Sequence, residues 1–259
     1  ADAGVLYIID SIGGTPESVT EDCTDIAGGW SYDAGTATLT LDGFQGEYIE
    51  ANGDINIVLK GKNKITISAE STEGIKSTGK VTIDDTISPV QDCLDIYCSD
   101  GTESVSMIYT GGFGADYATY IVGGTVNLVE ENTRRRYVTG ISRLAYVEND
   151  ASLNINLSAD GGRNGVAALL NLNTSGDTSF RVNSLSSSSY GVYSLDKKGS
   201  GDTALAAEGK AKNIGNKFTV GSTGNTGKIT IKGYLTDFTP YRKKNRIVGV
   251  DNFLWSYFT

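Results

Sequence analysis

A short motif recurs along most of this chain at a loose spacing of roughly 24 residues, which lies in the range of solenoid repeats. Each copy places an aliphatic residue before a Gly, Asn or Asp turn that leads into an alternating segment, most clearly at residues 48–59 and 74–83. The aliphatic position, or its equivalent, falls at Ile49, Ile75, Leu94, Ala118, Ile141, Val166, Val192 and Ile214. The spacing therefore predicts a stack of coils.

The segments within each coil have the pattern of short β-strands. Polar and aliphatic residues largely alternate at residues 36–41, 54–59, 64–67, 80–83, 125–129, 152–157 and 228–231, as a strand with one buried face requires. The 33 glycines suit the many tight turns that join such strands. We expect an all-β, right-handed parallel β-helix, a pectate-lyase-like solenoid of roughly eight coils with aromatic caps at both ends.

A solenoid of this kind buries one aliphatic ladder along its axis. We predict that the ladder is formed by equivalent inward side chains of successive coils, namely Ile49, Ile75, Leu94, Ile141, Val166 and Val192. Within the alternating segment 54–59, Ile57 is expected to point into the stack and Asn56 to point outward.

The whole chain, residues 1–259, is expected to form a single β-helix domain, because a solenoid grows along one axis and does not split as it lengthens. Residues 1–47 are assigned to an N-terminal cap and the first strands, residues 48–233 to regular coils, and residues 234–259 to a C-terminal cap. Trp30 and Tyr32 would cover the open N-terminal end, with a sugar-stacking platform as the alternative. Aromatic residues that would cover the last coil are Phe238, Tyr241, Phe253, Trp255, Tyr257 and Phe258.

The formal net charge of −9 disfavours nucleic acid and anionic membranes as partners. Apolar runs are too short to span a bilayer, so we expect no membrane insertion. The basic run at residues 242–246 is interpreted as a solvated face of the C-terminal cap, with contact to an anionic polymer as the alternative. The opening Ala-Asp-Ala-Gly fits a chain whose leader was removed, which is compatible with a secreted or cell-wall-associated protein.

The chain contains no histidine, which excludes Ser-His-Asp and Cys-His catalysis and histidine-ligated metals. We expect no metal site and no cofactor. The cysteines Cys23, Cys93 and Cys98 lack metal-ligand spacing, and the offset between the last two puts their thiols on opposite faces of an unbroken strand. We interpret them as buried small apolar residues, and one disulfide remains the alternative.

Carboxylates are the remaining catalytic candidates. Asp84 and Asp85 follow a predicted strand, and Asp92 and Asp95 flank the next one. Paired carboxylates about 5 to 9 Å apart can act as acid and base on a glycosidic bond. Adjacent aspartates at a strand end are more commonly turn formers or solvated charges, and we assign no catalytic residues.

Aromatic residues gather around a glycine-rich segment at residues 111–114. Tyr109, Phe113, Tyr117 and Tyr120 lie within about a dozen residues, and flat aromatic faces suit the apolar C–H faces of sugar rings. These four are the candidate ligand-binding residues. The alternation of the sequence also predicts that at least two of them point into the core, which would make their role structural.

Residues 29–43 and 49–65 carry a more specific signature: Gly29-Trp30-Ser-Tyr32-Asp33, then Thr-Leu-Thr-Leu, then Gly-Asp-Ile-Asn-Ile-Val-Leu-Lys-Gly-Lys-Asn-Lys-Ile. This segment resembles the opening of uncharacterised β-helix modules in surface proteins of gut Firmicutes, which are often labelled carbohydrate-binding. The resemblance covers about residues 29–83. It implies a secreted or wall-associated β-helix and supplies no catalytic residues.

Together these patterns lead us to expect a non-catalytic, extracellular surface recognition or adhesion module that binds a carbohydrate or another host or cell-surface polymer. One alternative is a carboxylate-dependent polysaccharide lyase or glycosidase, and another is a structural spacer of a larger cell-surface protein. An outer groove with three or more carboxylates would favour the enzyme. Exposed aromatic side chains without such a cluster would favour binding, and a smooth polar surface would favour the spacer. The oligomeric state stays open.

Overall fold

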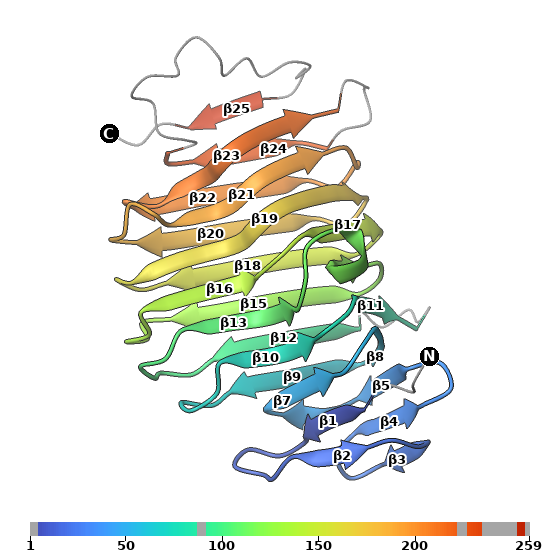
Figure 1. Cartoon of the computed structure of the whole chain (residues 1–259). Coiled ribbons are helices and arrows are strands. Elements are labelled where there is room, and N and C mark those ends of the chain that lie inside the picture. The colour runs from blue at the N-terminus through green and yellow to red at the C-terminus, as the bar shows by residue number, and fades with distance from the viewer. Residues whose placement is uncertain (1–4, 87–91, 222–226, 235–252, 257–259) are drawn as a thin grey trace.

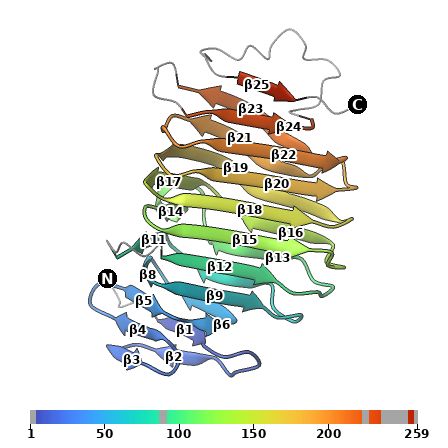
Figure 2. The ribbon, with the colours of Figure 1, turned by 180° about the vertical axis from the view of Figure 1, so that it is seen from behind.

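The computed structural model describes residues 5–86, 92–221, 227–234 and 253–256, the last segment by its backbone alone. Apart from a single turn of 3-10 helix, η1 (Ala115–Tyr117), all regular structure in these residues is β-strand. The strands form one 16-stranded and one nine-stranded sheet, in which most neighbours pair in parallel. Figure 1 and Figure 2 show these strands stacked rung upon rung from one end of the molecule to the other. The arrangement is consistent with a β-solenoid.

Three rows of strands run along the stack. The first row is β7 (Tyr48–Ala51), β10 (Glu73–Ser77), β13 (Val105–Thr110), β16 (Tyr137–Ile141) and the opening parts of β19 (Gly162–Thr174), β21 (Tyr190–Lys197) and β23 (Lys212–Val220). The second row is β5 (Thr38–Asp42), β8 (Ile55–Lys60), β11 (Val81–Asp85), β14 (Thr119–Ile121), β17 (Ala145–Asn149) and the closing parts of those three long strands. The third row is β6 (Gln45–Gly46), β9 (Lys62–Ile67), β12 (Cys93–Cys98), β15 (Thr125–Glu131), β18 (Ser152–Ser158), β20 (Thr178–Ser184), β22 (Thr203–Gly209), β24 (Ile229–Lys232) and β25 (Phe253–Ser256).

The 16-stranded sheet contains both the first and the second row because β19 continues from one into the other. Its first part pairs with β16 through Ile141↔Val166, and its last part pairs with β17 through Ala145↔Leu170. The register shifts between Val166 and Leu169, where the strand turns the corner. Two rows that are separate at the N-terminal levels therefore merge into one sheet.

An aliphatic ladder runs through the first row, as the repeat predicts. Its paired and fully buried members are Ile49, Ile75, Ile108, Ile141, Val166, Val192 and Ile214. Five of the six predicted positions are confirmed. Leu94 is wrong: it is buried in the third row, between Asn63 and Val126 of the neighbouring levels, and Ile108 takes its place in the ladder.

The reason for this error is coil length. Successive ladder members are separated by 26, 33, 33, 25, 26 and 22 residues, so two coils are about a third longer than the others. A uniform period of roughly 24 residues divides the span from Ile75 to Ile141 into three short coils, where the structure has two long ones. The alternating segments are nevertheless strands, and Ile57 is buried while Asn56 is exposed, as expected.

Antiparallel strands close the N-terminal end of the stack, drawn in blue in Figure 1. β1 (Leu6–Ile9) pairs antiparallel with β2 (Glu17–Val19) and with β7, which places Ile8 beside Ile49. β3 (Cys23–Asp25), β4 (Trp30–Asp33) and β5 form a second antiparallel set. The side chains of Trp30 and Tyr32 are 3% and 5% exposed, so their interpretation as a sugar-stacking platform is wrong. The aromatic residues and basic run assigned to a C-terminal cap lie outside the described side chains.

Two buried arginines stabilise the corner between the third and first rows. Arg163 forms a bidentate pair with Glu130, with Nε–Oε2 and Nη2–Oε1 distances of 2.9 and 3.1 Å, and both side chains are inaccessible to solvent. Arg135 is equally buried but bonds only to backbone: it donates to the carbonyl oxygens of Ser68, Ser71, Ser99 and Glu103. Because those carbonyls belong to two preceding turns, Arg135 connects three levels of the stack.

Candidate functional site

The candidate site is a loop that leaves the stack between β13 and β14. Strand β13 ends where the Gly111 N–H donates to the Ser77 carbonyl at 2.8 Å. Gly114 then adopts a φ of 103°, a conformation that favours glycine, and Tyr117 N–H donates to the Gly114 carbonyl at 3.1 Å to close η1. Figure 1 shows this turn as a green coil beside β17. The loop projects beyond the second row without interrupting the ladder.

Phe113 is the most exposed ring of the loop, at 78%. The guanidinium carbon of Arg143 lies 4.2 Å from its ring centroid and 5.8 Å from the centroid of Tyr109. Arg143 comes from the next coil, at the turn between β16 and β17. A cation over an aromatic face contributes about 0.5–1 kcal/mol at an exposed site. Arg143 therefore supports one face of Phe113 and leaves the rest of the ring open to solvent.

Tyr117 is held from below by a glycine. A Cβ at Gly112 would lie 2.5 to 2.7 Å from three atoms of the Tyr117 ring, so the ring packs directly over the Gly112 backbone. The side chain remains 39% exposed. The glycine thus allows a close approach that fixes one ring face and leaves part of the tyrosine free, which is the geometry of a supported aromatic platform.

Tyr120 belongs to a different arrangement. Its ring stacks on Tyr146 of the next level, with centroids 4.6 Å apart and planes 5° from parallel. The Lys80 ammonium lies 5.8 Å from the Tyr120 centroid. Burial raises the pKa of the Tyr120 phenol, and the neighbouring Tyr146, Glu148 and Asp116 act in the same direction. Because Tyr146 and Lys80 lie against its ring, Tyr120 is not open to a ligand and has a structural role beside the loop.

The structure brings Tyr109 and Phe113 together through Arg143, and it places Tyr117 in the same loop as Phe113. None of the four candidate aromatics is buried in the core, so the expectation that at least two point inward is wrong. The reason is that Phe113 and Tyr117 lie in a loop, where strand alternation does not apply, and Tyr109 and Tyr120 occupy outward positions of their strands. Arg143, Tyr146 and Lys80 were missed, since assigning them requires the true coil lengths.

Asp84 and Asp85 lie together at the end of β11 (Val81–Asp85), whereas the other two carboxylate candidates have separate roles. Asp92 is 2% exposed and structural: its Oδ1 accepts from the Gly61 N–H at 2.6 Å and its Oδ2 from the Thr86 hydroxyl at 2.9 Å. Asp95 lies on the outer face of the third row, where its Oδ1 accepts from Asn127 Nδ2 at 2.7 Å. Asp84 is exposed and accepts from the backbone N–H of Asp85 at 2.9 Å.

Asp85 is half-buried among other acidic side chains. Burial raises its pKa, and the charges of Asp150, Asp84 and Asp92 add to the effect. A carboxyl with a raised pKa is a candidate general acid, although structural clusters produce the same shift. Within residues 5–86, 92–221 and 227–234, no group of three or more His, Cys, Asp or Glu side chains is placed to hold a metal ion.

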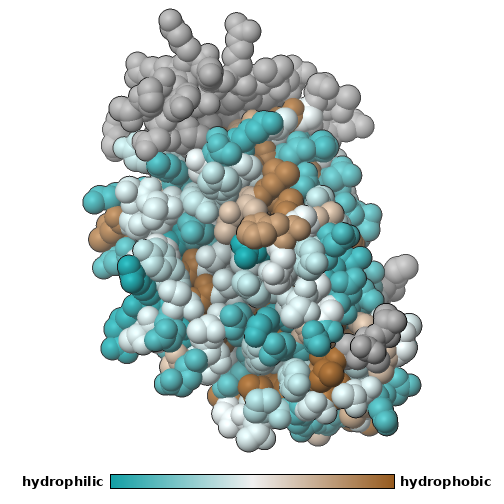
Figure 3. All heavy atoms as spheres, in the orientation of Figure 1, coloured by the Kyte–Doolittle hydropathy of each residue, from teal (hydrophilic) through white to brown (hydrophobic). Residues whose placement is uncertain are grey.

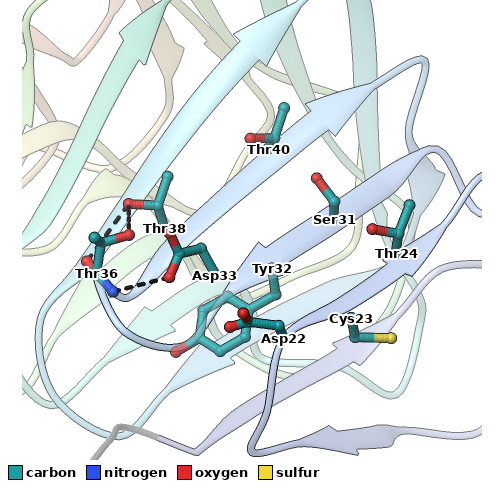
Figure 4. Close-up of a pocket in the computed structure, with 9 residues that line it drawn as sticks. All are labelled: Asp22, Cys23, Thr24, Ser31, Tyr32, Asp33, Thr36, Thr38 and Thr40. Atoms are coloured by element: carbon teal, nitrogen blue, oxygen red, sulfur yellow. Dashed lines mark hydrogen bonds between the residues drawn. The ribbon is translucent and has the colours of Figure 1, made fainter.

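Apart from the loop, a hollow of about 420 Å³ lies on the outer face of the N-terminal antiparallel strands (Figure 4). Its lining is rich in hydroxyls and comprises Asp22, Cys23, Thr24, Ser31, Tyr32, Asp33, Thr36, Thr38 and Thr40. Thr24, Ser31 and Thr40 stand side by side on adjacent strands. The hollow lacks an exposed aromatic face because Tyr32 is buried. Its hydroxyls could form hydrogen bonds with a sugar, but it has no aromatic ring on which the sugar could stack.

Of the three cysteines, which were expected to be buried apolar residues, the structure buries Cys98 alone. All three are free, and β12 places Cys93 and Cys98 on opposite faces as predicted. Cys98 is buried, which raises the pKa of its thiol to about 11. Cys23 is exposed and Cys93 is half-buried, so their assignment as buried apolar residues is wrong.

The surface around these features is mixed. Figure 3 shows polar and apolar side chains interspersed on the face seen in Figure 1, with the most hydrophobic residues in small separate patches. No helix among the described residues is long and apolar enough to cross a membrane.

Comparisons with protein-family models, curated proteins and solved structures gave no match to the chain.

Proposed function

We propose that the chain is a right-handed parallel β-helix that serves as a non-catalytic, secreted or wall-associated recognition module and binds carbohydrate at the loop of residues 111–118. Parallel pairing between successive levels supports the fold, and the strong preference of parallel crossovers for the right-handed connection supports its handedness. The resemblance of residues 29–83 to surface modules of gut Firmicutes motivates the location and the ligand class.

One observation carries the proposal: two exposed aromatic rings, Phe113 and Tyr117, are each supported on one side by the protein. An exposed ring without support loses conformational freedom when it binds, whereas a ring already packed on one face loses less. Sugar rings present apolar C–H faces that such a platform can accept, with hydroxyls left for neighbouring polar groups. A loop that served only to connect β13 and β14 would not need exposed rings.

The test is affinity electrophoresis of the whole chain through gels containing plant, mucin or bacterial-wall polysaccharides. Phe113→Ala and Tyr117→Ala should each weaken retention several-fold, which corresponds to about 1 kcal/mol for one stacked ring. Tyr97→Ala is the matched control, because Tyr97 is also 39% exposed but lies on the third row and packs against Lys64. Circular dichroism of each variant monitors folding.

If both loop variants are retained as strongly as wild type, the loop is not the binding site. If wild type is not retarded by any polysaccharide, carbohydrate binding is refuted, and the spacer or protein-adhesion functions take its place.

A second candidate function follows from the raised pKa of Asp85 beside Asp84, Asp92 and Asp150. In a polysaccharide lyase or glycosidase, this carboxyl would act as the protonated acid and a neighbouring carboxylate as the base. The enzymatic alternative predicts release of unsaturated or reducing sugar ends from a polysaccharide, and it predicts that Asp85→Asn abolishes this release. Activity that survives in Asp85→Asn would exclude this site.

A further inference from the structure

Arg143, from the turn between β16 and β17, is a cation without a carboxylate partner beside the aromatic loop. Among the described residues it forms no ion pair, in a chain with 31 acidic and 22 basic residues. Three other arginines form ion pairs: Arg163 with Glu130, Arg134 with Asp100 and Arg181 with Glu208. Arg135 is saturated by backbone carbonyls, and Arg136 lies over the single ring of Tyr137. A guanidinium that lies beside two aromatic rings and forms no ion pair is therefore available to a ligand of opposite charge.

The rings fix how the guanidinium can be approached. Its Nε is buried and donates no hydrogen bond, while its guanidinium carbon lies 4.2 Å from the Phe113 ring centroid and 5.8 Å from that of Tyr109. The two terminal nitrogens are not among the buried unpartnered atoms, and they donate to no described residue. A ligand can thus reach the end of the guanidinium fork. Two parallel N–H donors at this end match the two oxygens of a carboxylate.

We propose that this site selects sugars that carry a carboxylate, such as uronic or sialic acid residues. Arg143 binds the carboxylate end-on, while Phe113 and Tyr117 accept the apolar face of the same or the adjacent sugar ring. This inference rests on the proposed carbohydrate-binding function and names its ligand class. A neutral sugar would leave the terminal nitrogens hydrated and would gain nothing from Arg143.

The negative charge of the whole chain does not oppose this selectivity at physiological salt. Exposed charges are screened over about 8 Å at 0.15 M ionic strength, so nearby groups dominate. Asp116 and Glu148 act on Tyr120, which places negative charge beside the stacked Tyr120–Tyr146 pair. The sugar carboxylate is therefore expected at the Arg143 end of the site. The Lys80 ammonium offsets part of the charge at the tyrosine end.

The decisive comparison is between an acidic polysaccharide and its methyl ester, in which the negative charge is removed. Wild type is run through gels containing polygalacturonate, fully methyl-esterified polygalacturonate or polyglutamate, and mobility is referred to a gel without polymer. We expect retention in polygalacturonate to exceed that in the ester by about tenfold in affinity, as a charged hydrogen-bonded pair implies, and to fall with added salt. Polysialate provides a second acidic sugar polymer.

Two substitutions assign the effect to the guanidinium. Arg143→Gln should reduce retention in polygalacturonate to the level of the ester, and Arg143→Lys should recover only part of it, because an ammonium keeps the charge without the planar fork. Tyr97→Ala again serves as the matched control. The thermal midpoint of each variant shows whether the fold is intact.

The outcomes separate this inference from the proposed function. If wild type is retained equally by the acid and ester polymers, or if Arg143→Gln is retained as strongly as wild type, acid selectivity is overturned while sugar binding stands. Equal retention by polyglutamate would show general anion binding and would also overturn the inference. Absence of retention in every polysaccharide would overturn both proposals.

Discussion

The buried Glu130–Arg163 pair gives the sharpest test of how the stack is stabilised. Both side chains are inaccessible to solvent and form two direct N–O contacts of 2.9 and 3.1 Å. Further bonds satisfy the pair: Thr133 Oγ1 donates to Glu130 Oε1 at 2.6 Å, and Arg163 Nη1 donates to the Gly162 carbonyl at 2.9 Å. Replacing either partner with methionine leaves the other charge buried without its counterion.

The expected magnitudes follow from this geometry. Glu130→Met or Arg163→Met should each cost about 3–5 kcal/mol of unfolding free energy, because the remaining charge cannot be hydrated. The double variant removes both charges, so its cost should be clearly smaller than the sum of the two single costs, with a coupling of about 2 kcal/mol or more. What remains is the loss of the bonds to Thr133, Ser158 and Gly162, about 1 kcal/mol each.

The assay is urea unfolding of wild type, both single variants and the double variant. Far-ultraviolet circular dichroism and tryptophan fluorescence should give coincident transitions, since a free energy is defined only if the solenoid unfolds in one step. Single variants within about 1 kcal/mol of wild type would refute the reasoning, because they would show that water reaches the pair. Strict additivity in the double variant would equally contradict it.

Three further predictions concern the core, a buried lysine and the loop. Ile57→Asp should cost about 3 kcal/mol or more in urea unfolding, because it buries an unpaired charge, whereas Asn56→Asp on the exposed face should cost little; equal midpoints would contradict the assigned faces. Lys197 is 1% exposed, and burial lowers its pKa while Asp202 and Asp177 oppose the shift. Since the unfolded chain binds the proton more tightly, wild-type stability should rise as pH increases from the lowered folded pKa towards the ordinary lysine value of 10.5, and Lys197→Met should lose that rise in pH-dependent melting curves. Gly112→Ala should displace the Tyr117 ring and weaken glycan retention without changing the thermal midpoint, and unaltered retention would exclude Tyr117 as a platform.

Sequence periodicity predicted the strands and most of the ladder because alternation and stacking are local consequences of burying one face. Ile49, Ile75, Ile141, Val166 and Val192 were assigned correctly from their spacing alone. Leu94 was not, because two long coils separate Ile75 from Ile141. A solenoid tolerates such differences, since each level needs only to match its neighbours in the strands and not in the turns.

The buried charges could not be predicted for a different reason. Arg135 and Arg163 lie in two polar segments whose sequences are typical of turns, and arginine is rarely fully buried. Their burial depends on carbonyls supplied by the turns of preceding coils and on the carboxylate of Glu130 in β15. The aromatic candidates were found by residue type, but Arg143 and Tyr146 join them only through the register between levels, which the sequence does not display.

The position of the loop follows from how the long coils arise. In the coil from Ile108 to Ile141, eight residues separate β13 from β14, whereas three residues, Ser142 to Leu144, make the same corner in the next coil. The ladder residues pair above and below this loop without a break, so its extra residues add nothing to the stack. Residues that the scaffold does not need, placed on a rigid support and ending in exposed rings, are where a recognition function can be acquired without loss of stability. Arg143, from the short corner of the next coil, then gives the loop a charge that the loop itself lacks, and so makes the site a property of two adjacent coils.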